Sequence, residues 1–132
     1  LADICAAFVT LIDRLLFRKT EPAQEAIEVV AKSSAGLNVK HLVQRKVTDN
    51  EVVGRLYSKA CYIDDSWPSL LYLLYKYVNN PLQALLANTN VGGENCHRGS
   101  VLGVLLGLAT ADECAAFFDR LVARDAIDVE IR

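Results

Sequence analysis

The sequence lacks several features that would assign it to a specialised class of protein. Lysine and arginine (14) do not outnumber aspartate and glutamate (16), and the net charge is -2, so no basic surface for nucleic acid is expected. A bilayer-spanning helix needs about 20 apolar residues, and no such run is present. No basic segment precedes an apolar one near Leu1, so we do not expect a signal peptide.

The cysteines also lack a pattern. The four residues Cys5, Cys61, Cys96 and Cys114 contain no C-x-x-C pair and lie mostly among apolar, helix-like neighbours. This arrangement favours free thiols in a reducing compartment, and therefore a cytoplasmic protein.

Methionine is absent altogether, and the chain begins with Leu1 inside a helical pattern. We therefore expect a fragment, the C-terminal half of a larger all-α fold. If that holds, the apolar stripe near Leu1 has to be covered by missing residues or by another copy of the chain, which makes a homo-oligomer an expectation.

The composition present is that of one globular domain covering residues 1–132, because 52% of the residues are hydrophobic and 23% are charged. Apolar residues recur at spacings of three and four in segment after segment, which predicts an all-α, orthogonal multi-helix domain of about eight helices. Only residues 127–131 alternate with period two, and this predicts a short extended segment. The expected helix-start signals are Thr20 with Pro22, Asn38, Thr48 with Glu51, Ser66 with Pro68, Asn80 with Pro81, and Thr110 with Glu113; Gly36 is the expected stop signal.

Glycines recur every fourth residue in one apolar helix, at Gly99, Gly103 and Gly107. Each glycine costs about 1 kcal/mol relative to alanine in a helix interior. We expect the stripe to let other backbones approach closely in a crowded centre. The competing interpretation is a membrane helix with a G-x-x-x-G face, but the run is too short and is bounded by Arg98 and Asp112.

The segment from Asn88 to Gly99 holds the only concentrated chemistry in the chain. Adjacent glycines, Gly92 and Gly93, allow a tight turn and close approach to a ligand, and free N–H groups at a helix start favour anions. We expect a ligand site here, formed by Asn90, Gly92, Gly93 and Asn95. The alternative is a turn whose polar residues only cap the helix.

The sequence Asn90-Val91-Gly92-Gly93-Glu94-Asn95-Cys96-His97-Arg98-Gly99, with the glycine-spaced helix that follows, resembles the C-terminal signature of the ADP-ribosylglycohydrolase family, also called the DraG or crystallin J1 family. Tyr62-Ile63-Asp64-Asp65-Ser66-Trp67-Pro68 is similar to the segment that leads into that family's preceding helix. The resemblance is strongest over residues 60–125.

The resemblance implies a metal site that this chain alters. Family members are all-α and use two magnesium ions to cleave the glycosidic bond between ADP-ribose and a protein side chain. Their signature supplies Asp-x-Asp-Thr or Asp-x-Asp-Ser ligands, and here Glu94, Cys96 and His97 stand at those positions. Magnesium prefers oxygen ligands, whereas thiolate and imidazole suit zinc or another transition metal. Either the metal has changed or the site has lost it.

Three hypotheses follow from the resemblance. In the first, the protein is an ADP-ribosylglycohydrolase-like hydrolase in which Glu94 is catalytic and Glu94, Cys96 and His97 help to hold a divalent metal. In the second, it is a non-catalytic module that binds ADP-ribose-like ligands. In the third, it is a structural helical domain of the crystallin type. The expected partner is an ADP-ribose-like small molecule or an ADP-ribosylated protein.

Other polar residues have simpler interpretations. Asp64 and Asp65 are better placed to start a helix than to catalyse a reaction. His41 has no acidic or sulfur ligand in register, which indicates a surface or boundary residue. The tyrosines Tyr72, Tyr75 and Tyr77, together with Trp67, predict an aromatic rim with hydroxyls at its edge, and one of these four rings could stack on an adenine.

Overall fold

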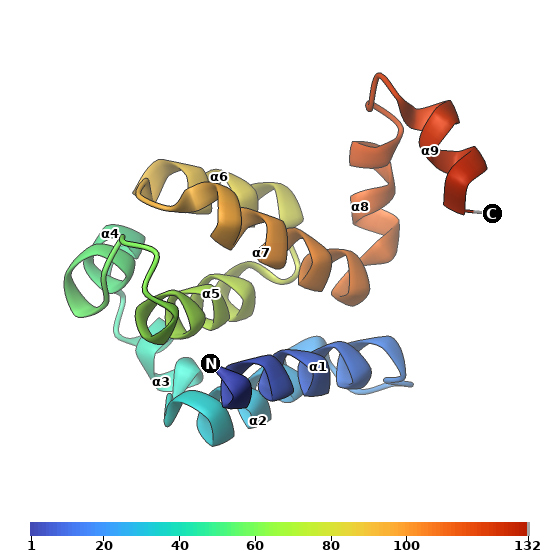
Figure 1. Ribbon diagram of the computed structural model, residues 1–132. Helices are drawn as coiled ribbons and strands as arrows, with labels where there is room; N and C mark the ends of the chain where they lie inside the picture. The colour runs from blue at the N-terminus through green and yellow to red at the C-terminus, as the bar shows by residue number, and fades with distance from the viewer. Residues whose placement is uncertain (132) are drawn as a thin grey trace.

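The computed structural model describes residues 1–131, and this part of the chain is all-α with no strand, as the periodicity predicts (Figure 1). In chain order the helices are α1 (Ala2–Leu16), α2 (Ala23–Ala35), α3 (Val39–Gln44), α4 (Asp49–Glu51), the π-helical turn η1 (Val52–Leu56), α5 (Ile63–Tyr77), α6 (Pro81–Val91), α7 (Asn95–Ala109), α8 (Ala111–Phe118) and α9 (Arg124–Ile131).

Helix α5 lies at the centre of the molecule, with α1 and α2 on one side and α6 and α7 on the other (Figure 1). A helix covered on several sides must be apolar around most of its circumference. Every residue from Trp67 to Leu74 is accordingly buried. Helices α8 and α9 extend away from this core and contain no buried residue (Figure 1).

Local capping chemistry places several helix ends where the sequence predicts them. Asn38 and Asn80 each accept a hydrogen bond from the third residue of their helix, and Thr48 and Glu51 form the expected capping box. Gly36 ends α2 in the left-handed conformation. These signals need only neighbouring residues, so the sequence is sufficient to find them.

The predicted start signals of three helices are wrong. Pro22, without a side-chain hydrogen bond, replaces Thr20 at the start of α2. Helix α5 begins at Ile63, one turn before the expected cap Ser66, and Pro68 lies inside it. Thr110 does not form a capping box, because its hydroxyl donates to the carbonyl of Leu106 in the preceding helix.

The predicted extended tail is also wrong, since residues 127–131 belong to α9. The expectation of a crowded glycine stripe holds only at Gly99, where an added Cβ would lie 2.9 Å from the side-chain nitrogen of Asn88. Gly103 and Gly107 have no such neighbour within 4 Å. Within residues 1–131, no helix has the length and apolarity needed to cross a bilayer.

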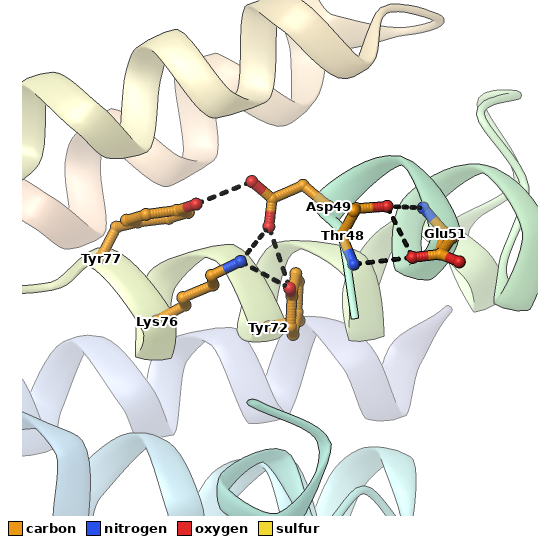
Figure 2. A network of polar contacts seen from close by, with 6 residues as sticks. All are labelled: Thr48, Asp49, Glu51, Tyr72, Lys76 and Tyr77. Carbon is orange, nitrogen blue, oxygen red and sulfur yellow. Dashed lines mark hydrogen bonds and ion pairs between the residues drawn. The ribbon is translucent and has the colours of Figure 1, made fainter. Parts of the chain in front are cut away.

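A polar network fixes α4 against α5 (Figure 2). The carboxylate of Asp49 accepts hydrogen bonds from Tyr72 (2.9 Å), Lys76 (2.6 Å) and Tyr77 (2.7 Å). The ammonium of Lys76 also lies 5.3 Å and 5.1 Å from the centroids of the two tyrosine rings. The predicted tyrosine rim is thus partly internal, because Tyr72 is fully buried while its hydroxyl reaches Asp49.

Candidate functional site

A pocket of about 190 Å³ lies between the first turns of α5 and α7. Its wall is largely apolar and includes Ile63, Trp67, Leu70 and Val101. Its ionisable side chains include Glu94, His97 and Arg98. Pockets that enclose a whole drug-sized ligand usually measure about 300 to 1,000 Å³, so this one matches a single group or ring of a larger ligand.

The double-glycine turn brings Glu94, His97 and Arg98 to this pocket. Helix α6 continues to Val91, so the first residues of the segment from Asn88 to Gly99 are helical. Gly92 and Gly93 then adopt φ values of +70° and +69°, which residues other than glycine rarely adopt. The carbonyl of Lys59 accepts a hydrogen bond from the backbone N–H of Glu94 at 3.0 Å.

Close approach of the loop at Lys59 makes Gly93 necessary. A Cβ atom at Gly93 would lie 2.2 Å from the carbonyl oxygen of Lys59 and 2.9 Å from its carbonyl carbon. The ammonium of Lys59 also donates to the side-chain oxygen of Asn50 at 2.7 Å. The turn and the loop between η1 and α5 therefore lie against each other at one edge of the site.

Glu94 and His97 form a pair at the mouth of the pocket. Nδ1 of His97 lies 2.5 Å from Oε2 of Glu94, one helical turn away. The side chain of His97 is 88% exposed and that of Glu94 is 43% exposed, so solvent screens the interaction between them. Within residues 1–131, Oε1 of Glu94 has no hydrogen bond and is available to a ligand or a water molecule.

Trp67 lines the pocket and is held in place by residues of α1 and α2. Its indole N–H donates to the hydroxyl of Ser34 on α2 at 2.9 Å, and its ring packs edge-on against Phe8 of α1, with centroids 6.5 Å apart. The ring is therefore oriented by two other helices before any ligand arrives.

Arg98 also lines the pocket and is only 3% exposed. Its Nε donates to Oδ1 of Asn88 at 2.7 Å, and its Nη2 donates to the carbonyl of Gly92 at 2.9 Å. Burial lowers the pKa of the Arg98 guanidinium, and the nearby charge of Glu94 partly offsets this effect. The guanidinium joins the end of α6 to the start of α7.

The residues predicted from the sequence do not all meet at the pocket. Of the expected ligand and metal residues, Glu94 and His97 line it; Asn90, Gly92, Gly93, Asn95 and Cys96 are not among its lining residues. Asn90 and Cys96 are exposed. The side chain of Asn95 instead donates to the carbonyl of Thr89 at 3.4 Å.

Sequence reasoning did not assign Arg98 or Asn88 to the site, and it gave Trp67 only as one of four aromatic residues that could stack on an adenine. One signal was available for Arg98, which precedes the buried Leu102 by four residues and so lies on the buried stripe of α7. An arginine in such a stripe needs partners inside the protein. The approach of Lys59 to Gly93 left no comparable signal.

The remaining candidates lie where the simpler interpretations predict. Asp64 and Asp65 are in the first turn of α5, and His41 is exposed. The four cysteines are free thiols, and three of them, Cys5, Cys61 and Cys96, are exposed.

The donor set at the turn does not fit magnesium. Mg²⁺ requires near-octahedral oxygen ligands, and among residues 1–131 Glu94 is the only carboxylate that lines the pocket. Among residues 1–131, no three His, Cys, Asp or Glu side chains are arranged so that they could hold a metal ion.

Comparison with known proteins identifies the family. The family described as ADP-ribosylglycohydrolase matches residues 1–113 of the 132-residue chain, which includes α1 to α7 and the whole pocket. No curated protein and no solved structure matches the chain. Because the match extends over most of the sequence, the chain belongs to the ADP-ribosylglycohydrolase family.

Proposed function

We propose that the protein is a hydrolase that cleaves an ADP-ribosyl glycosidic bond at the pocket between α5 and α7. Membership of the family supports a hydrolase-like function at a general level. The observation that carries the specific proposal is Glu94, whose carboxylate lies at the pocket mouth with Oε2 held by His97 and Oε1 unpaired among the described residues.

In this proposal Glu94 acts as the general base for an attacking water molecule. The water oxygen bonds to the anomeric carbon of the ADP-ribosyl group while the glycosidic bond breaks. Overall, hydroxide adds to the sugar and a proton reaches the released side chain of the modified protein. Hydrolysis of this kind passes through a positively charged sugar, which a carboxylate beside the anomeric carbon stabilises.

His97 is a positioning residue in this scheme. By contacting Oε2, it turns the second oxygen of Glu94 away from His97 and leaves Oε1 for the water. The apolar wall around Trp67 excludes other solvent from the reacting group.

Binding without turnover is the second candidate function. It is favoured by the combination of an intact pocket with a donor set that does not form a three-ligand metal cluster among residues 1–131. In that case the protein recognises an ADP-ribose-like ligand and leaves its glycosidic bond intact.

One experiment separates these functions. Purified protein is incubated with an ADP-ribosylated protein and the released ADP-ribose is measured, with and without a chelator, while calorimetry measures ADP-ribose binding. We expect Glu94→Gln to lower turnover about 100-fold or more, as is typical for loss of a general base. Glu113→Gln, at an exposed glutamate on α8, is the matched control and keeps full activity.

The outcomes distinguish the alternatives. Binding without release of ADP-ribose, in the presence or absence of added magnesium or zinc, supports the binding module. Release that is abolished by the chelator indicates a metal held with help from residues that the described site does not gather. Failure to bind ADP-ribose in any condition contradicts both functions.

A further inference from the structure

The pocket wall contains a buried guanidinium that forms no ion pair with a carboxylate of residues 1–131. Arg98 is 3% exposed, and its partners are the neutral oxygens of Asn88 and Gly92. Among residues 1–131, no carboxylate oxygen lies within 4.0 Å of the guanidinium. Buried charges in proteins are normally paired, because removing an ion from water is costly.

One nitrogen of the same guanidinium is left without any partner. Nη1 is buried and has no hydrogen bond, whereas Nε and Nη2 are both used. Buried donors without an acceptor are rare, and an arginine donor is among the most costly to leave unpaired. This unpaired donor belongs to a residue that also forms part of the pocket wall.

The surroundings of the Arg98 guanidinium favour an anion as the acceptor for Nη1. Arg98 lies in the first turn of α7, where the unpaired backbone N–H groups and the helix dipole add positive potential. Glu94, the nearby acid at the mouth, is paired with His97. Because the side chain of His97 is largely exposed, it can move aside to admit a ligand.

We propose that Arg98 is the anion-binding residue of the pocket and that its Nη1 donates a hydrogen bond to a phosphate oxygen of the ligand. The planar guanidinium is held in place by Asn88 and Gly92, so the phosphate meets a donor that is already oriented. This inference rests on the proposed function only in using the same pocket, and under that function the group bound is the diphosphate of ADP-ribose.

The direct test uses the unmodified protein. Pyrophosphate is titrated into protein labelled with ¹⁵N and ¹³C, and the guanidinium signals are followed by NMR, with Arg98 assigned through its backbone connectivities. We expect the Arg98 signals to shift with a saturable profile. Acetate and sulfate, titrated in parallel, distinguish phosphate recognition from a general response to anions. No shift of the Arg98 signals at saturating pyrophosphate overturns the proposal.

Variants provide the second readout. Arg98→Lys keeps the charge but loses the fork of donors, and we expect pyrophosphate affinity to fall about tenfold or more, as for the loss of a charge-assisted hydrogen bond. Arg120→Lys, at an exposed arginine, is the matched control with unchanged affinity. Circular dichroism checks that each variant is folded, and unchanged affinity in folded Arg98→Lys contradicts the proposal.

This inference and the proposed function can fail separately. If pyrophosphate binds at Arg98 but ADP-ribose neither binds nor is released, the anion site stands and the hydrolase function fails. If ADP-ribose is released in a Glu94-dependent way while Arg98→Lys has unchanged affinity and turnover, the hydrolase function stands and the anion site fails.

Discussion

Arg98 and Asn88 join the two helices that meet at the double-glycine turn, since Nε of Arg98 donates to Oδ1 of Asn88 across 2.7 Å. The amide of Asn88 is used on both sides, because its Nδ2 donates to the carbonyl of Asn95 at 2.8 Å. A single buried side chain thus fixes both the guanidinium in the pocket wall and the first residue of α7.

Replacement of Asn88 by alanine removes both bonds and leaves Nε of Arg98 buried without its acceptor. We expect Asn88→Ala to lower the free energy of unfolding by about 1–3 kcal/mol, the usual cost of an unsatisfied buried donor. Urea denaturation followed by circular dichroism measures this change. Asn90→Ala, at an exposed position in the same turn of α6, is the control, and we expect it to be neutral or slightly stabilising. Equal effects of the two variants contradict the role given to Asn88.

Gly93 is the position where the turn tolerates a side chain least. In Gly93→Ala, the added methyl group would overlap the carbonyl of Lys59, on top of the strain of a φ value of +69°. We expect a loss of more than about 2 kcal/mol in unfolding free energy. Gly36→Ala isolates the conformational part, because Gly36 has a φ value of +59° and no neighbour within 4 Å of the added atom. Thermal unfolding of both variants tests the difference, and a Gly36→Ala effect as large as that of Gly93→Ala is the contrary result.

The fold could be predicted because its determinants are local or periodic. The stripe on α5 and the capping box at Thr48 and Glu51 each depend on residues within one helix or one turn. One error arose where two local hydrogen bonds compete for the same side chain. Thr110 was expected to cap the helix that follows it, but its hydroxyl bonds to the preceding helix.

The site could be predicted only in outline. The glycine pair and Glu94 mark the turn, because a run of glycines and polar residues before a helix is visible in the sequence. The loop that packs on Gly93 comes from Lys59, 34 positions earlier, and nothing in the local pattern of either segment encodes that approach. The unpaired Nη1 of Arg98 depends on the same tertiary contacts, so it emerges only from the structure.

Asp49 makes the unfolding free energy of the protein depend on pH in the acidic range. Burial raises the pKa of Asp49, but the hydrogen bonds that it accepts outweigh this effect and leave the pKa below its ordinary value of 3.8. A lowered pKa in the folded state means that the stabilisation is present above the unfolded value and is lost as the pH falls through the folded value. We expect the unfolding free energy of the protein to decrease from about pH 5 downward.

The variant Asp49→Asn tests this assignment. At pH 7 we expect it to lose about 1–3 kcal/mol, because Lys76 then keeps its charge without a carboxylate. Between pH 5 and pH 2 its stability should fall less than that of the unmodified protein, as measured by urea denaturation at each pH. Asp112→Asn, at an exposed position in α8, serves as the control. Parallel acid profiles for the unmodified protein and Asp49→Asn rule out Asp49 as the source.

Tyr72 makes the unfolding free energy depend on pH in the alkaline range as well. Burial raises the pKa of Tyr72 from 10.0 to about 12, and its hydrogen bond to Asp49 acts in the same direction. A raised pKa in the folded state stabilises the protein below the unfolded value, and this contribution is lost as the pH rises through the folded value. We therefore expect about 1–2 kcal/mol of unfolding free energy to be lost between pH 10 and pH 12.

The variant Tyr72→Phe should lose less unfolding free energy over this pH range, although it is less stable than the unmodified protein at pH 8. Tyr62→Phe, at an exposed tyrosine, should follow the unmodified protein. Ultraviolet titration of the tyrosinates, read alongside chemical denaturation, detects the step, and full ionisation of every tyrosine near pH 10 would contradict the buried network.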